Sequence, residues 1–241
     1  MKVDIAGVLI DNVSKAEAIE KIDSFLMSGG SHYVVTPYSE MILEAMNNET
    51  YRLALNSADL SIADGISVIY SARLFGYKLK ERITGSRFVY DIAKFALMKN
   101  YSLALVGGEG NVAAQAAYEL KNKFPGLKIN LALSGRPFDD RIISEINSSN
   151  SDILLIAHAT VKQELWLSEN VKKLTTKVAI GLGGTFDYLS GKYPSAPNFI
   201  HSMGFEWLWR LITQPWRITR IWKAVIVFPI KLIVYKLWHR W

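Results

Sequence analysis

Short apolar runs alternate with amphipathic stretches over the first 190 residues of the chain. Six of these runs have little internal polar alternation, which is typical of strands covered on both faces of a sheet. They predict strands at Tyr33–Thr36, Ala58–Ala63, Leu103–Val106, Ile129–Leu133, Ile153–Ala157 and Val178–Gly181. One more strand is predicted at the N-terminus, over residues 1–12, where Asp4 and Asp11 surround a short apolar run.

The stretches between these runs have the spacing of amphipathic helices. Ser14 and Glu17 form a capping box, and apolar residues then recur at helical spacing. Further helices are predicted after Tyr38, after Gly65, and over Phe88–Met98, Asn111–Phe124 and Lys162–Leu174. The alternation of strands and helices predicts an α/β fold with a Rossmann-like, mostly parallel sheet and flanking helices.

The C-terminal segment differs in charge and in aromatic content. The chain has 28 basic and 22 acidic residues, and residues 201–241 hold seven of the bases but only one acid, Glu206. The preceding 200 residues are therefore balanced, with 21 of each. The segment also holds six of the seven tryptophans. Tryptophan favours the membrane interface and basic residues attract anionic lipid, so we predict an anionic membrane surface as a partner. Nucleic acid is a poorer fit, because the interleaved aliphatic side chains would be unused on a phosphate backbone.

Helical spacing supports the membrane interpretation of this segment. A helix starting near Pro215 places Arg217 and Arg220 on one face, because they are three residues apart. Its apolar side is formed by Ile218, Trp222, Val225 and Ile226. A helix of this kind lies in a membrane interface. Pro229 is expected to kink or end it.

These patterns divide the chain into two parts. Lys192–Pro197 is the predicted boundary, so that residues 1–195 form the sheet domain and 196–241 a helical appendage. No window of eighteen residues is free of charge, so we expect shallow embedding of the appendage and not a transmembrane crossing.

Four polar or glycine-rich segments follow predicted strands. They are Thr36–Glu40, Asp64–Gly65, Gly107–Gly110 and Gly183–Asp187. In parallel α/β sheets, ligands bind beyond the carboxyl ends of the strands, so these segments are expected to meet in one crevice.

Each segment allows a chemical and a structural interpretation. Asp64 can accept a proton from an incoming hydroxyl, or it can be a turn or helix-capping residue. Gly107, Gly108 and Gly110 can admit a phosphate at a helix start, or they can simply make a tight turn. Gly183 and Gly184 resemble a second anion-binding turn. Gln163 can bind a sugar or phosphate, or it can be an ordinary polar residue of a first helical turn.

Several classes of site are not predicted. The chain has no cysteine, which excludes disulfides and thiolate metal sites, and its four histidines lack metal-ligand spacing. We therefore predict neither a metal nor a cofactor. No serine-hydrolase elbow is present. The glycines after Leu103–Val106 suggest a dinucleotide oxidoreductase only weakly, because the fingerprint is incomplete.

The same segments, in this order, resemble one enzyme family over nearly the whole chain. The most specific stretches are ADGISVIYSARLFG from Ala63, ERITGSRF from Glu81, KQE from Lys162, GLGGTFDYLSGKYPSAP from Gly181, and GFEWLWRL from Gly204 followed by QPWRITR from Gln214. They resemble the WecG/TagA/CpsF glycosyltransferases, glycosyltransferase family 26.

The resemblance implies an inverting, metal-independent transfer from a UDP-sugar, such as UDP-N-acetylmannosamine, to a polyprenyl-diphosphate-linked saccharide. It implies a peripheral enzyme on the cytoplasmic face of the cell membrane that serves teichoic acid or exopolysaccharide synthesis. It also implies homo-oligomers.

The resemblance assigns roles to individual positions of this chain. Asp64 matches the proposed general base and Thr36 a polar residue of the donor pocket. Arg82 and Gln163 match residues near the donor or its leaving diphosphate. Three appendage arginines match residues thought to fold over the site and bind diphosphate, namely Arg210, Arg217 and Arg220.

The chain departs from the family pattern at five positions. Tyr38 stands in the donor pocket, where an asparagine is usual, and Arg87 stands where an acidic residue is usual. Ala159, Val161 and Ser195 replace a glycine, a proline and an arginine. These departures keep an alternative open, in which the protein is a catalytically degenerate, membrane-bound scaffold.

Overall fold

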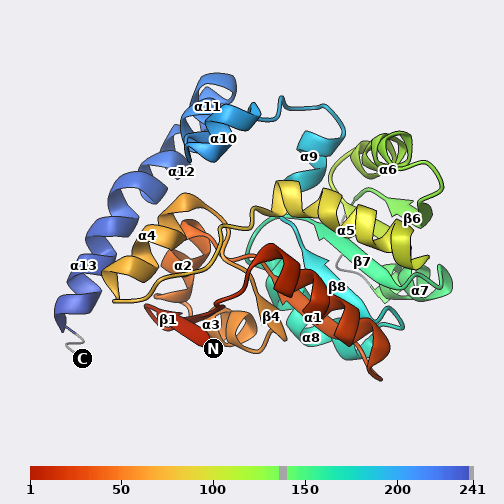
Figure 1. Ribbon diagram of the computed structural model, residues 1–241, viewed down its shortest axis with the longest axis horizontal. Coiled ribbons are helices and arrows are strands. Elements are labelled where there is room, and N and C mark those ends of the chain that lie inside the picture. Colours follow the sequence, from red (N-terminus) through yellow and green to blue (C-terminus); the bar gives the residue numbers. More distant parts are fainter. Residues whose placement is uncertain (136–139, 239–241) are drawn as a thin grey trace.

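A six-stranded parallel sheet forms the centre of the protein. The computed structural model describes residues 1–135 and 140–238 (Figure 1). The strands are β3 (His32–Val35), β4 (Leu60–Ser61), β5 (Ser102–Gly107), β6 (Lys128–Leu133), β7 (Ile153–Ala157) and β8 (Val178–Gly181). Their order across the sheet is β4-β3-β8-β7-β5-β6, and each neighbouring pair is parallel. The predicted α/β fold with a parallel sheet is confirmed.

The edge strand β4 is much shorter than its apolar run. The run Ala58–Ala63 predicted six residues, but only Leu60 and Ser61 pair with β3. Beyond them the chain still follows its neighbour, because the Asp64 N–H donates to the Pro37 carbonyl at 3.0 Å. Pro37 has no N–H to donate back to the neighbouring segment, so the hydrogen-bond ladder between β3 and β4 ends there. This early end places Asp64 at the edge of the sheet with its side chain free to turn inward.

The prediction of one strand over residues 1–12 was wrong. Two short strands, β1 (Lys2–Ile5) and β2 (Val8–Asp11), pair antiparallel in a hairpin apart from the main sheet. Ala6 and Gly7 form its turn with φ of 51° and 85°. Positive φ at both central residues is typical of the two-residue turn that matches strand twist. The Asp4 carboxylate accepts the Gly7 N–H at 2.7 Å and holds the turn.

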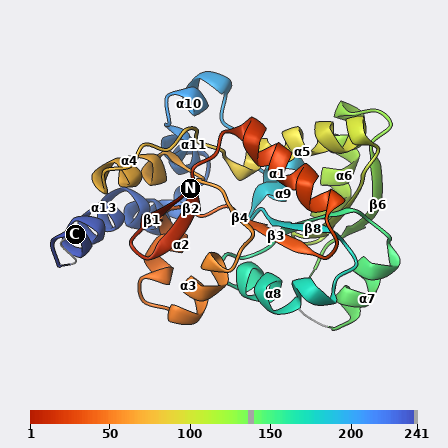
Figure 2. The same cartoon turned by 60° about the horizontal axis from the view of Figure 1, so that its bottom comes forward.

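Helices cover both faces of the sheet (Figures 1 and 2). One face packs against α1 (Lys15–Met27), α5 (Gly85–Lys99), α6 (Val112–Lys123) and α9 (Thr185–Leu189). The other packs against α2 (Ser39–Ala45), α3 (Glu49–Asn56), α7 (Asp140–Ser148) and α8 (Lys162–Asn170), which continues into η1 (Val171–Lys173). α4 (Ile66–Leu74) lies beside the hairpin. The capping box of α1 is confirmed, whereas α3 and α7, of eight and nine residues, were not predicted.

The C-terminal segment folds into helices that return across the sheet domain. They are α10 (Asn198–Ser202), α11 (Glu206–Thr213), η2 (Pro215–Arg217), α12 (Ile218–Trp222), the π-helix η3 (Lys223–Val227) and α13 (Phe228–Trp238). From α12 to α13 they form one long rod beside α4 in both views (Figures 1 and 2). Phe228 and Leu232 of this rod are each 1% exposed within the core that includes Met41 of α2. The appendage therefore shares its core with the sheet domain.

The helical segment does not end at Pro229, so that part of the expectation was wrong. The rod continues through it into α13, and the five residues before Phe228 form a π-helix. A proline in an α-helix clashes with the carbonyl four residues back and leaves it without a donor. A π-helical turn changes that hydrogen-bond spacing, so we attribute the uninterrupted rod to η3. None of the helices within residues 1–135 and 140–238 is long and apolar enough to cross a membrane.

Candidate active site

One large cleft opens at the carboxyl ends of the strands. Its volume is about 1810 Å³, and it is bounded by the loops after β3, β4, β5, β7 and β8 and by the appendage. Eleven of the thirteen predicted site residues line it. They are Thr36, Tyr38, Asp64, Arg82, Gly108, Gln163, Gly183, Gly184, Arg210, Arg217 and Arg220. Gly107 and Gly110 are absent from its lining. The crevice expected from the strand ends therefore exists.

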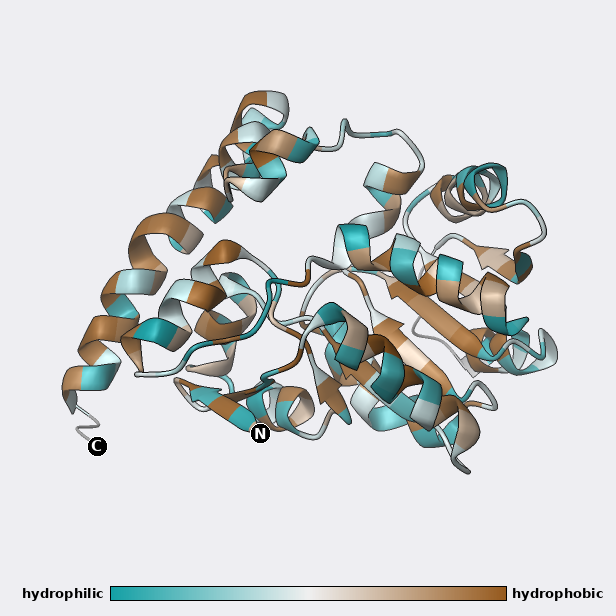
Figure 3. Cartoon of the chain, in the orientation of Figure 1, coloured by the Kyte–Doolittle hydropathy of each residue, from teal (hydrophilic) through white to brown (hydrophobic). Residues whose placement is uncertain are grey.

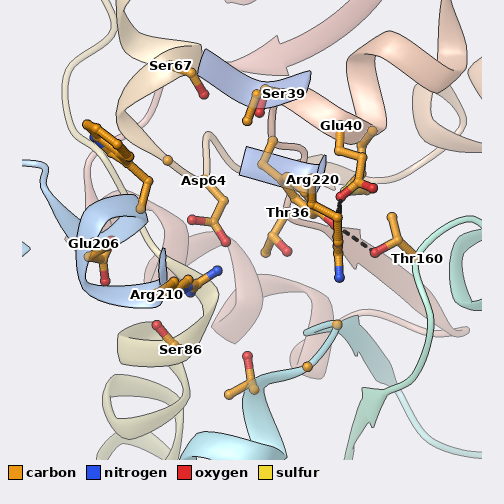
Figure 4. A pocket seen from close by; sticks show the side chains of 18 of the residues that line it. Thr36, Ser39, Glu40, Asp64, Ser67, Ser86, Thr160, Glu206, Arg210 and Arg220 are labelled. Atoms are coloured by element: carbon orange, nitrogen blue, oxygen red, sulfur yellow. Dashed lines mark hydrogen bonds and ion pairs between the residues drawn. The ribbon is translucent and has the colours of Figure 1, made fainter. Parts of the chain in front are cut away.

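Asp64 and Thr36 lie together at the floor of this cleft (Figure 4). The Asp64 carboxylate accepts the N–H of Gly85, the first residue of α5, at 3.2 Å. A Cβ on Gly85 would lie 3.5 Å from Asp64 Oδ2 and 3.7 Å from Thr36 Oγ1. Thr36 donates its hydroxyl to the Gly181 carbonyl at 3.1 Å. Asp64 does not cap α4, because the N-cap of that helix is Gly65 and it has no side-chain cap.

The surroundings of Asp64 suit a proton acceptor. Burial raises the pKa of its carboxyl from 3.8 to about 6. The Gly85 N–H and the charges of Arg210 and Arg82 oppose this shift, while Glu206 adds to it. A carboxylate with a pKa near 6 is still ionised at neutral pH but is a stronger base than an ordinary aspartate. The structure therefore places a carboxylate with a raised pKa in the lining of the cleft, and its role as a general base stays a prediction.

Arg82 and the appendage form a charged cluster beside Asp64. Arg82 donates to the His201 carbonyl, and its guanidinium lies 3.8 Å from the Glu206 carboxylate. Glu206 in turn lies 2.9 Å from Nδ1 of His201. This cluster ties the loop before α5 to α10 and α11, so it fixes the appendage over the cleft.

Two arginines of the appendage stack on tyrosines that follow β8. The Arg210 guanidinium lies 5.1 Å from the centre of the Tyr188 ring, and that of Arg217 lies 6.0 Å from the Tyr193 ring. Stacking of this kind orients a guanidinium while leaving its N–H groups free to bind an anion. Figure 4 shows Arg210 pointing toward Asp64 from the appendage side.

Arg220 is held by partners within the chain. It makes two hydrogen bonds to Glu40 of α2, at 2.7 and 2.9 Å, and one to the Tyr38 hydroxyl at 3.1 Å. Tyr38 also bonds to the Thr160 hydroxyl at 2.7 Å, and burial raises the pKa of its phenol to about 12. The tyrosine that departs from the family pattern thus joins the loops after β3 and β7 to the appendage.

We expect the Arg220–Glu40 pair to stabilise the packing of the appendage against α2. Both side chains are partly exposed, at 47% and 31%, so a double-mutant cycle with Arg220→Ala and Glu40→Ala should give a coupling energy of about 0.5–1 kcal/mol. The measurement is the free energy of unfolding of the four proteins in urea. A coupling energy of zero would show that the pair contributes nothing to the stability of this packing.

Gln163 joins two loops of the cleft. Its carbonyl oxygen accepts the N–H of Gly183 at 3.1 Å and that of His158 at 3.2 Å. Its amide nitrogen donates to the buried Glu164 carboxylate. The amide therefore fixes the loop after β8 against the loop after β7. The sequence alone suggested a sugar or phosphate contact for Gln163, and that role stays a prediction.

The buried Glu164 carboxylate holds the Gln163 amide and two further donors in place. Glu164 is 1% exposed, it accepts the Tyr51 hydroxyl at 3.1 Å and the Val161 N–H at 2.8 Å, and burial raises the pKa of its carboxyl. Removing a buried acceptor leaves each donor unsatisfied at a cost of about 1–3 kcal/mol, so Glu164→Ala should lower the free energy of unfolding by about 3 kcal/mol. Glu169→Ala, at an exposed position of the same helix, is the control and should change it by less than about 0.5 kcal/mol. Equal effects in thermal or urea unfolding would contradict this role.

The first glycine turn is explained by backbone packing. A Cβ on Gly107, whose φ is 127°, would lie 2.1 Å from the Ala157 carbonyl oxygen. Gly108 has a φ of 71° and donates its N–H to the same carbonyl at 2.9 Å. This geometry supports the tight-turn interpretation for Gly107. Of the three glycines, Gly108 is the one that faces the cleft.

Sequence reasoning missed several residues of these networks. They are Glu40, Tyr51, Thr160, Glu164 and Glu206. A signal existed for Glu206, because it is the single acid among the basic residues of 201–241. Glu40 fell within a segment expected at the crevice. Among the described residues, no three acidic or histidine side chains are grouped so that they could hold a metal ion.

Comparison with known proteins assigns the family. A sequence model of the Glycosyl transferase WecG/TagA/CpsF family matches residues 3–241. The chain belongs to this family. As a WecG/TagA/CpsF member it is a glycosyltransferase, which removes the oxidoreductase alternative.

Two similar relatives carry the same name, N-acetylglucosaminyldiphosphoundecaprenol N-acetyl-beta-D-mannosaminyltransferase. The relative from Bacillus spizizenii is 31% identical over 224 residues, which cover 88% of this chain and 86% of the relative. The relative from Staphylococcus aureus strain MRSA252 is 25% identical over 240 residues, which cover 96% and 92%. This WecG/TagA/CpsF member is thus similar to both along most of their length.

The structure gives a position to the Arg87 departure. Arg87 donates to the Asn198 side chain at 2.9 Å and to the Ala196 carbonyl at 3.3 Å. It therefore holds the start of the appendage against α5.

Val161, another departure from the family pattern, has a φ of 76°, an unusual value for a β-branched residue. The Glu164 carboxylate accepts its N–H.

Proposed function

We propose that this glycosyltransferase moves N-acetylmannosamine, or a related sugar, from a UDP-sugar to a polyprenyl-diphosphate-linked saccharide in cell-surface polysaccharide synthesis. The observation that carries the proposal is Asp64, a base with a raised pKa in a cleft that appendage arginines also face. The printed names of the relatives support the transferred sugar and the diphosphoundecaprenol acceptor.

In the proposed reaction, an acceptor hydroxyl attacks the anomeric carbon of the donor and gives its proton to Asp64. The new glycosidic bond forms as the bond from that carbon to the UDP oxygen breaks, and UDP leaves with the bonding electrons. A single displacement of this kind inverts the anomeric configuration. Thr36, which is buried beside Asp64, is proposed to contact the donor sugar.

The leaving diphosphate requires positive charge. Arg82, Arg210 and Arg217 line the cleft and are proposed to supply it, because guanidinium groups form paired, charge-assisted hydrogen bonds with phosphate. We propose that these arginines make the reaction independent of a metal. The Gly183–Gly184 turn also lines the cleft and is proposed as a further contact for the nucleotide.

We further propose that the appendage holds the enzyme at the cytoplasmic face of the membrane. Its helices expose large apolar side chains, and apolar positions recur along the whole rod in Figure 3. The exposed set includes Trp216, Trp222, Ile230, Val234, Leu237 and Trp238. An apolar surface with basic residues around it suits an anionic lipid interface. A lipid-linked acceptor would then be presented where the cleft opens.

The decisive experiment is a donor screen. Full-length enzyme is incubated with UDP-sugars and a short-chain acceptor that carries N-acetylglucosamine diphosphate, and UDP release is measured with and without EDTA. We expect release with UDP-N-acetylmannosamine, a β-linked product by NMR, and less than a two-fold effect of EDTA. Absence of release with every donor would favour the scaffold alternative, which is consistent with an Arg220 guanidinium already bonded to Tyr38 and Glu40.

A further inference from the structure

The cleft has an apolar arm that the proposed chemistry does not use. Beyond Asp64 it continues between α4 and the rod formed by α12, η3 and α13, which lie side by side in Figures 1 and 2. The arm is lined by Ile66, Tyr70 and Leu74 on one side and by Ile221, Val225 and Ile233 on the other. No acidic or basic side chain is among these six, in contrast to the charged lining around Asp64.

The arm is an open channel and not a packed helix interface. Tyr70, Val225 and Ile233 are 59%, 38% and 49% exposed although they face the cleft. Phe228 and Leu232, each 1% exposed, form its floor. Side chains that are this apolar and this accessible leave surface that an apolar ligand would cover.

Contacts between α4 and α13 mark the far end of the arm. Lys236 donates to the Leu74 carbonyl at 2.6 Å, and the rings of Phe75 and Tyr235 meet edge to face at 6.3 Å. These contacts fix the separation of the two helices along the arm. Ile66 lies at the near end, where Gly204 packs closely against it. The arm thus has a defined length, beginning beside the charged cluster and ending at Leu74.

We propose that this arm binds the first isoprene units of the acceptor's polyprenyl chain. The inference rests on the proposed function, because only a lipid-linked acceptor joins a saccharide, a diphosphate and an isoprenoid in one molecule. One cavity holds Asp64, arginine side chains and the uncharged arm, which are the groups that such a molecule requires. Ile233 and the next residue, Val234, are 49% and 47% exposed, so a longer chain would leave the arm over this surface toward the proposed membrane side.

A chain-length series tests the assignment without a membrane. Acceptors with the same saccharide diphosphate and a methyl, citronellyl or farnesyl tail are compared as monomers below their micelle concentrations. For the native enzyme we expect KM to fall by roughly ten-fold or more from methyl to farnesyl, because apolar surface is buried. A KM that does not depend on the tail would overturn the proposal, whereas no transfer to any acceptor would refute the proposed function itself.

Two neighbouring residues provide matched variants. Val225 and Ile226 are both 38% exposed and lie in the same π-helical segment, but only Val225 lines the cleft. Val225→Asn should bring the ratio of the methyl to the farnesyl KM close to one, whereas Ile226→Asn should change it by less than two-fold. An unchanged ratio in Val225→Asn, or an equal loss in both variants, would refute the assignment.

Other occupants of the arm give different results in the same assay. If phospholipid chains fill the arm, monomeric short-chain phosphatidylglycerol should inhibit transfer to every acceptor by the native enzyme. The KM should then not depend on the acceptor's tail. If a second copy of the chain covers the arm, the KM ratio should fall as enzyme concentration rises. Either result would overturn the isoprenoid assignment.

Discussion

Replacing Asp64 by asparagine is expected to lower kcat/KM for sugar transfer by about a thousand-fold or more, since loss of a general base removes proton acceptance from the attacking hydroxyl. Asparagine keeps the shape of the side chain and can still accept the Gly85 N–H. The measurement is UDP release with the short-chain acceptor, with circular dichroism to verify the fold. Full transfer by the variant would refute the base assignment.

The matched control for this variant is Asp59→Asn. Asp59 lies in the apolar run that precedes Asp64 and stands at the opposite end of β4, where its carboxylate accepts the Tyr33 N–H at 3.0 Å and lies 3.0 Å from the His32 ring nitrogen. It does not line the cleft. We expect transfer by this variant within two-fold of native, so a comparable loss in both variants would indicate a general effect of charge or folding.

The raised pKa of Asp64 also predicts two pH dependences. Because the proposed reaction requires the ionised carboxylate, kcat/KM should fall as pH drops through about 6. Stability has the opposite sign, because the folded protein binds this proton more tightly than the unfolded chain, whose carboxyl titrates near 3.8. The native protein therefore loses stability relative to Asp64→Asn as pH rises from about 3.8 to about 6, by at most about 3 kcal/mol, of which about 2 kcal/mol falls between pH 4.5 and pH 8. Urea unfolding of both proteins at pH 4.5 and pH 8 measures this difference.

Truncation after Ala196 is expected to abolish both vesicle binding and transfer. It removes the appendage arginines that face the cleft and six of the seven tryptophans. It also uncovers the core around Met41 that Phe228 and Leu232 fill. Flotation with vesicles containing anionic lipid measures binding, and UDP release measures activity. A truncated chain that still floats with the vesicles would contradict the proposed role of the appendage.

A full-length variant separates membrane attachment from catalysis. Ile230 and Val234 are 57% and 47% exposed on the rod and lie outside the cleft lining. Changing both to aspartate should weaken vesicle binding by roughly a hundred-fold, because two apolar contacts are lost and two charges oppose the anionic surface. Transfer to the short-chain acceptor should persist, because the cleft arginines remain. Loss of both properties would mean that the two roles cannot be separated.

The fold could largely be predicted from residue patterns. Buried parallel strands appear as continuous apolar runs, and five of the six central strands agree with the runs to within one residue at each end. The errors arose where a few residues decided the structure. Ala6 and Gly7 turned one expected strand into a hairpin, Pro37 shortened β4, and η3 let the rod pass Pro229.

The candidate site was predicted in part, because strand ends have a known place in such sheets. That rule brought Asp64, Thr36 and the glycine turns together before their geometry was known. The arginine roles came from family resemblance. The partners of these residues could not be predicted, because Glu40 and Arg220 are 180 residues apart and Tyr51 and Glu164 are 113 apart.

The sequence by itself determined the parallel α/β sheet, the family and the basic, tryptophan-rich character of residues 201–241, because periodicity, motif and charge are local properties of a chain. Only the tertiary structure decided that Asp64 turns from α4 toward α5, that Gln163 joins two loops, and that the appendage encloses an apolar arm beside α4. These features depend on which surfaces meet after folding. A side chain's pKa and its hydrogen-bond partners follow from that packing, which no local pattern in the sequence specifies.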